Sequence, residues 1–301
     1  MELRQLRYFI EVAKREHVTE AALSLHVAQS AVSRQLVNLE DELGVQLFIR
    51  EGRNVKLTPI GRGFLEHVEQ AMKVLENAKR EIEEYLDPNQ GTIRIGFPSS
   101  LATYVLPTAI SAFRSEYPLV KFSLSQGGYH SLIERVINGE IDMAILGPVP
   151  THEKKVKGEV FFTDRIYGLF PTTHPLVANK EVRLDQLIDE QFVLFPKGYV
   201  LREIIEKACM QLGFQPKISF EGEDIDAIKG LVSAGLGITL IPEVTLIDSL
   251  PRSTVKKPII NPQVTRSVGV IIPSERPLLP TEKLFYTFLR DYFAIINKFQ
   301  H

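Results

Sequence analysis

The sequence predicts a chain of three parts: an N-terminal helical domain, a long linking helix, and a C-terminal α/β domain of two lobes. Three observations support this prediction. Apolar residues recur at helical spacing before residue 58, a helical pattern without an interior proline runs from Pro59 to Leu86, and strand and helix signals alternate after residue 92. At 301 residues the chain is long for a single core, so two or three domains are expected.

Two short helices joined by a turn are predicted between residues 19 and 43. Thr19 is placed to cap a helix that continues to Leu25, and residues 26–28 form the turn. The second helix has a face of apolar residues at spacings of four, three and four, which would pack on a core: Val32, Leu36, Leu39 and Leu43. Five of its polar residues, on the opposite face or at the start of the helix, can hydrogen-bond base edges and phosphates in a DNA major groove: Gln29, Ser30, Ser33, Arg34 and Asn38. The periodicity alone fits an ordinary helical pair equally well.

A basic hairpin is predicted to follow this helix. Gly44 ends the helix, and residues 47–58 have the pattern of a strand, a turn and a second strand. Three basic residues stand there against the single acid Glu51: Arg50, Arg53 and Lys56. Residues 1–91 carry 12 Lys and Arg against 15 Asp and Glu, and the whole chain has a net charge of −2. Contact with DNA phosphates must therefore come from this local patch.

The first 58 residues contain LRQLRYFIEVAKREHVTEAA, AQSAVSRQLVNLEDELGVQLFIR and LTPIG in this order. They resemble the winged helix-turn-helix of LysR-type transcriptional regulators, and the resemblance extends through the whole chain. It implies a regulator, not an enzyme, that binds double-stranded promoter DNA. Later segments such as GFPSSLA and GEDIDAIKGLVSAGLGITLIPE are similar to family members that activate glutamate synthesis, which implies an activator of nitrogen or glutamate metabolism genes.

The linking helix, residues 59–87, has the spacing of a coiled coil. Its apolar seam is interrupted by Lys79 and consists of Leu65, Val68, Met72, Leu75, Ile82 and Leu86. Because about 28 helical residues extend about 42 Å, a small winged domain is too short to cover the seam, and a second copy of the chain is expected to do so. The resulting homodimer presents two recognition helices to an inverted-repeat site. The resemblance further implies tetramers and contact with RNA polymerase.

A hinge at residues 88–91 separates this helix from the effector domain, residues 92–301. Two segments, LIERVINGEIDMAIL and AIKGLVSAGLGITLI, share the order helix, glycine, strand, so we expect two similar lobes. Lobe one covers about 92–162 and 268–301, with helices at 101–117 and 281–299, and lobe two covers about 163–267. The chain is expected to cross between them near 147–162 and 264–269. The family shares this arrangement with periplasmic binding proteins, whose lobes close on a small ligand.

Polar residues at the predicted strand ends indicate where such a ligand binds. The candidates are Ser99, Ser100, Gln126 and Tyr129 in lobe one and Lys197 and Gly198 in lobe two. Hydroxyls, helix N-termini and a lysine favour a small anionic metabolite, which the resemblance narrows to 2-oxoglutarate or glutamate. Each candidate also has a plain structural reading: Ser99 as a helix cap, Lys197 as a solvated loop residue, and Gln126 with Tyr129 as an ordinary turn.

Other classes of function find little support in the sequence. The seven histidines show no metal-binding pair, there is no phosphate-binding glycine loop, and no metal or cofactor is expected. The acidic cluster of Glu221, Glu223, Asp224 and Asp226 is interpreted as solvated or capping, and Cys209 as a buried thiol. Without an apolar run of membrane length or a signal peptide, the protein is expected in the cytoplasm and off the membrane. Two alternatives remain. One is a solute-binding protein with a helical arm, and the other is a constitutive DNA-binding protein whose C-terminal half serves only for oligomerisation.

Overall fold

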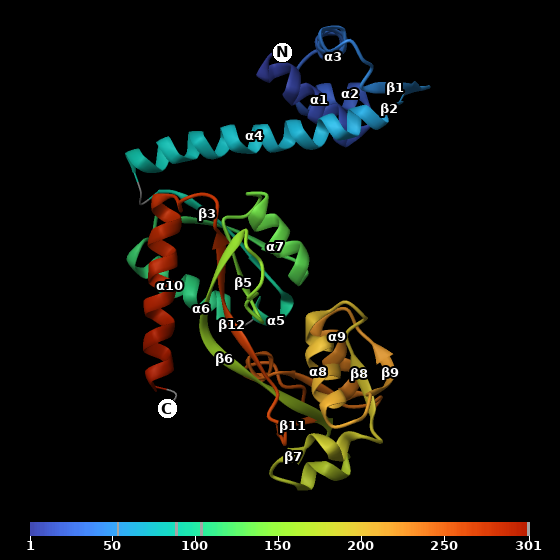
Figure 1. Cartoon of the computed structure of the whole chain (residues 1–301), viewed down its shortest axis with the longest axis vertical. Coiled ribbons are helices and arrows are strands. Elements are labelled where there is room, and N and C mark those ends of the chain that lie inside the picture. Colours follow the sequence, from blue (N-terminus) through green and yellow to red (C-terminus); the bar gives the residue numbers. More distant parts are fainter. Residues whose placement is uncertain (53, 88–89, 103–104, 300–301) are drawn as a thin grey trace. The chain divides into compact units, whose positions relative to one another are not determined.

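The computed structural model of the chain describes residues 1–52, 54–87, 90–102 and 105–299, with side chains up to residue 296 (Figure 1). The chain divides into two compact units, one from Met1 to Arg80 and one from Glu81 onward. The division falls inside the long helix α4, Pro59–Leu86. Arg53, and Pro88 and Asn89 of the expected hinge, lie outside the described residues.

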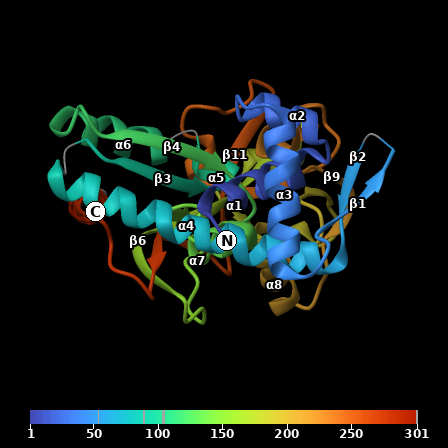
Figure 2. The same ribbon diagram turned by 90° about the horizontal axis from the view of Figure 1, so that it is seen from above.

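Three helices and a hairpin form the N-terminal domain: α1 (Leu3–Arg15), α2 (Val18–Ser24), α3 (Gln29–Leu43), β1 (Phe48–Glu51) and β2 (Asn54–Leu57). The helices pack around the buried Phe9, whose ring lies 5.3 Å from those of Phe48 and Phe64. The antiparallel hairpin projects from the helices as a wing (Figure 2). The predicted winged helix-turn-helix is therefore present.

Two details of the predicted helices were wrong. Helix α2 is capped by His17 instead of Thr19, because His17 has extended backbone angles and its Nδ1 accepts the Glu20 N–H at 3.3 Å. Leu43 is 36% exposed, since it ends α3 beside Gly44 and lies beyond the core that covers Val32, Leu36 and Leu39. Gly44 ends the helix as predicted, at a left-handed φ of +69°.

The seam of α4 has two different halves. Val68 is buried in the core of the N-terminal domain, and Leu65 and Met72 pack against that core. In the other half Leu75 is 48% exposed and Leu86 is 78% exposed. The expectation that a second copy covers the whole seam was therefore too broad, because the domain itself covers its first half.

Lobe one is a sheet with helices on both faces. Strands β3 (Thr92–Phe97), β4 (Lys121–Gln126) and β5 (Met143–Leu146) are parallel. Met143 and Ile145 face a core with α6 (Val105–Glu116) and α10 (Pro280–Phe299), whereas Ala144 and Leu146 face α7 (Tyr129–Ile137). The C-terminal helix α10 packs in lobe one as predicted. The described residues of the helix expected at 101–117 belong to α5 (Ser99–Ala102) and α6, and residues 103 and 104 between them lie outside the described residues.

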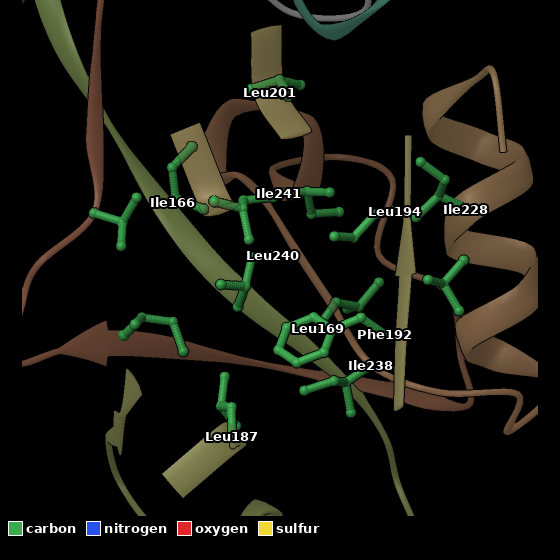
Figure 3. Packing of buried hydrophobic residues seen from close by; sticks show 14 of the residues in the cluster. Ile166, Leu169, Leu187, Phe192, Leu194, Leu201, Ile228, Ile238, Leu240 and Ile241 are labelled. Atoms are coloured by element: carbon green, nitrogen blue, oxygen red, sulfur yellow. The ribbon is translucent and has the colours of Figure 1, made fainter. Parts of the chain in front are cut away.

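Lobe two repeats part of the order of helices and strands seen in lobe one, and it is built around the core drawn in Figure 3. Its elements are η1 (Pro175–Ala178), β7 (Val182–Arg183), η2 (Leu184–Leu187), β8 (Gln191–Leu194), α8 (Val200–Gln211), β9 (Lys217–Glu221), α9 (Ile225–Ser233), β10 (Thr239–Pro242), η3 (Glu243–Leu246) and β11 (Thr254–Ile260). The predicted internal repeat is confirmed: α7 and β5 flank Gly139 at φ +68°, and α9 and β10 flank Gly235 at φ +79°.

Two long antiparallel strands, β6 (Val156–Pro171) and β12 (Thr265–Pro273), connect the lobes (Figure 1). The large sheet has the order β4-β3-β5-β12-β6-β11-β7, with β10 also paired to β6. On β6, Phe161 belongs to the core of lobe one and Ile166 to that of lobe two. The first crossing therefore lies between Phe162 and Ile166, at the expected boundary of lobe one and at the very end of the expected segment 147–162, because the start of β6 pairs inside the lobe-one sheet. No helix in the described part of the chain is long and apolar enough to span a membrane.

Candidate DNA interface and effector cleft

The predicted base-reading residues stand on the first turns of α3. Gln29, Ser30 and Arg34 are exposed, and Ser33 is half-buried. The Gln29 Nε2 donates to the Ser33 Oγ at 2.9 Å, so these two side chains form one hydrogen-bonding unit. The cap residue Ala28 has no side-chain oxygen to accept the first helical N–H groups, which leaves this helix end suited to a phosphate.

The wing is held against α3 by hydrogen bonds to Glu40. The Glu40 Oε1 accepts the backbone N–H groups of Leu47 at 2.7 Å and Phe48 at 3.0 Å. On the wing, Arg50 is exposed, and Lys56 pairs with Glu51 at 2.8 Å, which raises the pKa of Lys56. Exposed pairs of this kind contribute little to stability, so the Lys56–Glu51 pair is easily broken.

A cleft of about 480 Å³ opens between the two lobes of the second unit. Five of the six predicted effector residues line it: Ser99, Ser100, Gln126, Tyr129 and Gly198. Lys197 does not line it and is exposed, because the turn at residues 196–199 directs only Gly198 and Tyr199 to the cleft. A larger hollow of about 660 Å³ along α6 and β4 is lined mainly by apolar residues.

Two helices, one from each lobe, begin at this cleft. Gly128 precedes α7 and Tyr199 precedes α8, both with extended backbone angles and without a side-chain cap. The first-turn residues of both helices line the cleft: Tyr129, His130 and Ser131 of α7, and Val200 and Leu201 of α8. Because the first N–H groups of a helix have no partner within it, both ends can hydrogen-bond a carboxylate and favour negative charge.

A buried ion pair lies where β6 and β12 cross between the lobes. Arg266 faces Asp164 across the strands, and its Nε and Nη2 donate to the Asp164 Oδ2 at 3.0 and 2.9 Å. The Nη1 donates to the Ser100 Oγ at 3.0 Å. Burial raises the pKa of Asp164 and lowers the pKa of Arg266, while the attraction between them opposes both shifts.

This pair orients the hydroxyl of Ser100. A serine hydroxyl has one proton to donate, and the Ser100 oxygen already accepts from Arg266. Its own proton is therefore available to an acceptor in the cleft. Sequence reasoning missed Arg266 and Asp164, although each is a charged residue beside an apolar strand run, which is a signal for a buried pair.

Gly198 lines the cleft in a backbone conformation that favours glycine. Its φ is +90°, and a side chain there would meet no protein atom within 4 Å. Across the cleft, burial and the neighbouring Glu203 of α8 raise the pKa of Tyr129, so this phenol stays protonated and can donate.

The acidic cluster serves several purposes. Glu221 pairs with the buried Arg202 at 2.6 Å, Asp224 caps α9 by accepting two backbone N–H groups, and Asp226 lies 3.4 Å from Lys229. Glu223 lines the cleft. Within the described residues no group of three or more His, Cys, Asp or Glu is arranged to hold a metal ion. Burial raises the pKa of the Cys209 thiol to about 12, as suits a structural residue.

Comparison with known proteins identifies the family. Residues 3–62 match the bacterial regulatory helix-turn-helix protein model of the lysR family, and residues 87–294 match the LysR substrate binding domain. The chain belongs to the LysR family. It is 59% identical over 300 residues to "Transcriptional dual regulator GltC" of Bacillus subtilis (strain 168), which covers 100% of both chains. It is 30% identical to "Probable nitrogen assimilation transcriptional activator" of Synechococcus elongatus, which covers 97% of this chain and 95% of the relative.

Solved structures show the same architecture. Full-length CbnR complexed with its target DNA has a TM-score of 0.78 at 24% identity and covers 97% of this chain and 99% of its own. Full-length BenM has a TM-score of 0.63 at 30% identity and covers 99% and 98%. The predicted fold of a winged helix-turn-helix joined to a two-lobed domain is therefore confirmed, and the chain is a DNA-binding transcriptional regulator with an effector-binding domain.

Proposed function

We propose that this regulator binds a small metabolite with carboxylate groups in the interlobe cleft and changes its promoter binding in response. The observation that supports this proposal is the convergence of two helix N-termini, one from each lobe, on a cleft that also holds Ser100 as a hydrogen-bond donor. A ligand held at both helix ends is bound better when the lobes are close, so it shifts the population toward a closed form. The protein acts by binding and catalyses no reaction.

On DNA, α3 enters the major groove and the wing follows the phosphates. Gln29, Ser30, Ser33 and Arg34 contact bases or nearby phosphates, while Arg50, Arg53 and Lys56 contact the backbone. The matched test compares Arg34→Ala with Arg290→Ala, an exposed arginine of α10, in a gel-shift assay on the promoter. Arg34→Ala is expected to lose binding, and Arg290→Ala to keep it. Equal binding by both variants contradicts the assigned interface.

The protein works as a homodimer through the exposed half of α4, and as a homotetramer through edges of the effector domains. The support for the dimer is the apolar far half of α4, with Val74, Leu75, Ile82 and Leu86 exposed. Ile82→Glu is expected to lower the mass found by light scattering, since burying a carboxylate in an apolar seam is unfavourable whichever way the partner helix runs. An unchanged mass with retained promoter binding contradicts this interface.

The target genes belong to nitrogen or glutamate metabolism, and the effector is 2-oxoglutarate or glutamate. Support comes from the names of two relatives, one a dual regulator and one a nitrogen assimilation activator. The dual role of the first relative favours both activation and repression over the activator role expected from the sequence. Contact with RNA polymerase at the promoter and a cytoplasmic site of action follow from this role.

A thermal-shift screen of metabolite acids, repeated as a promoter footprint with each hit, tests the effector proposal. A ligand that binds only the folded protein raises the melting temperature with concentration. We expect a shift with a carboxylate ligand and a changed footprint. A screen without any shift leaves the DNA-binding role intact and favours a C-terminal half that serves only for oligomerisation.

A further inference from the structure

The charges that line the cleft do not suit a ligand that is only negative. Among the described residues that line it, Arg266 and Glu223 are the two with a formal charge when histidine is neutral. The charge of Arg266 is balanced at 2.9 Å by Asp164, which is itself buried. Among the lining residues this leaves the carboxylate of Glu223, together with the partial positive charges of the two helix ends. The carboxylate of Glu203 on α8 adds further negative charge near Tyr129.

Glu223 differs from the other acids around it. Glu221 is paired with Arg202, Asp224 caps α9, and Asp226 neighbours Lys229. For Glu223, the described part of the chain offers neither an ion pair nor a hydrogen bond to its carboxylate, which is exposed. A carboxylate in a ligand cleft that no cationic side chain neutralises favours a cationic group on the ligand.

We infer that Glu223 is a specificity-determining residue that binds an ammonium group, so that the cleft selects amino dicarboxylates over the corresponding oxo acids. This inference rests on the proposed effector role of the cleft. The complementary ligand has two carboxylates for the two helix ends and an ammonium for Glu223. An oxo dicarboxylate of the same length binds the same two helix ends, but it has no ammonium group and places two negative charges near the carboxylate of Glu223.

Three five-carbon dicarboxylates that differ at one carbon test this directly: L-glutamate with an ammonium, 2-oxoglutarate with a carbonyl, and glutarate with a methylene. Binding of each to the full chain is measured by calorimetry. We expect L-glutamate to bind about 10- to 100-fold more tightly than the other two, the range expected for a charged hydrogen bond. In Glu223→Gln this preference is expected to fall to within about threefold, with 2-oxoglutarate bound as well as before or better.

Glu181→Gln is the matched control, since Glu181 is an exposed acid of the same lobe that does not line the cleft. It is expected to keep the wild-type preference. His130 of α7 also lines the cleft. If Glu223 serves instead to contact His130 when the lobes close, Glu223→Gln should weaken the binding of all three ligands equally. That result overturns the inference, as does a wild type that binds 2-oxoglutarate as tightly as L-glutamate.

The two proposals fail in distinguishable ways. If none of the three acids nor any acid of the screen binds the wild type, the effector role of the cleft and the selectivity of Glu223 are both wrong. If 2-oxoglutarate or glutarate binds and Glu223→Gln changes no preference, the cleft remains an effector site and only the role of Glu223 is wrong.

Discussion

The two lobes bring groups of different character to the same cleft. Lobe one supplies Ser100, which is buried and already held by Arg266 at the crossing of the connecting strands. Lobe two supplies Gly198, Tyr199 and Glu223, which are all exposed. A group that is fixed before the ligand arrives loses little freedom on binding, whereas an exposed one must be ordered. On the proposed effector role of the cleft, Ser100 is therefore expected to contribute affinity, and Glu223 selection between ligands.

The largest effect in this comparison is expected at Arg266. Replacement by Met removes the partner of the buried Asp164 and leaves a buried carboxylate without compensation, which costs about 3–5 kcal/mol. Denaturant unfolding of the effector domain within the full chain measures this cost.

A double variant, Arg266→Met with Asp164→Leu, serves as the control, because replacing both partners by apolar residues restores much of the lost stability. If Arg266→Met alone is as stable as the wild type, the crossing is not a rigid support for Ser100, and lobe one has no advantage of preorganisation.

Lobe one is also expected to be the pH-sensitive half. Burial raises the pKa of Glu282, in the first turn of α10, to about 7, with Asp142 adding to the shift and Arg276 opposing it. An acid whose pKa is higher in the folded state stabilises the fold below its unfolded pKa of 4.5 and loses this contribution as the pH rises to about 7.

Melting curves of wild type and Glu282→Gln between pH 5 and pH 8 measure this loss. The variant lacks the titrating group, so its melting temperature is expected to rise relative to that of the wild type as the pH increases. A constant difference over this range means that Arg276 holds Glu282 charged throughout and that burial does not dominate.

A smaller effect is expected at the turn of lobe two. Gly198→Ala forces a side chain into a backbone conformation with φ +90° and is expected to cost about 1 kcal/mol, although no atom blocks the side chain. Gly230→Ala is the control, because Gly230 lies inside α9 with open space around it and alanine favours helix by up to about 1 kcal/mol. Chemical denaturation should move the two variants in opposite directions. If Gly198→Ala leaves the free energy of unfolding unchanged, the turn can adopt another backbone conformation without cost.

The sequence could predict the residues at strand ends but not the contacts made between distant strands. Four of the predicted residues lie at or shortly after the ends of β3 and β4: Ser99, Ser100, Gln126 and Tyr129. Strand ends can be predicted from hydrophobic patterns, so the position of these residues at the cleft could be anticipated. Arg266 and Asp164 are about 100 residues apart, and only the pairing of β6 with β12 brings them together. No local pattern contains that pairing. The capping by His17 and the exposure of Leu43 likewise depend on where the core ends, which periodicity does not specify.

The smallest effect is expected at Lys197 of lobe two. Its positive charge suggested a ligand contact from the sequence, but in the structure it does not line the cleft. It is exposed and outside the cleft lining, so Lys197→Ala is expected to change stability by less than about 0.5 kcal/mol. Its charge acts on a ligand only through water and salt, which screen it within about 8 Å at physiological ionic strength. Calorimetry with a bound acid should therefore show equal affinity for variant and wild type at that salt, and at most a small loss at low salt. A large loss that persists at high salt means that Lys197 reaches the ligand when the lobes close, and that lobe two supplies binding charge as well as selection.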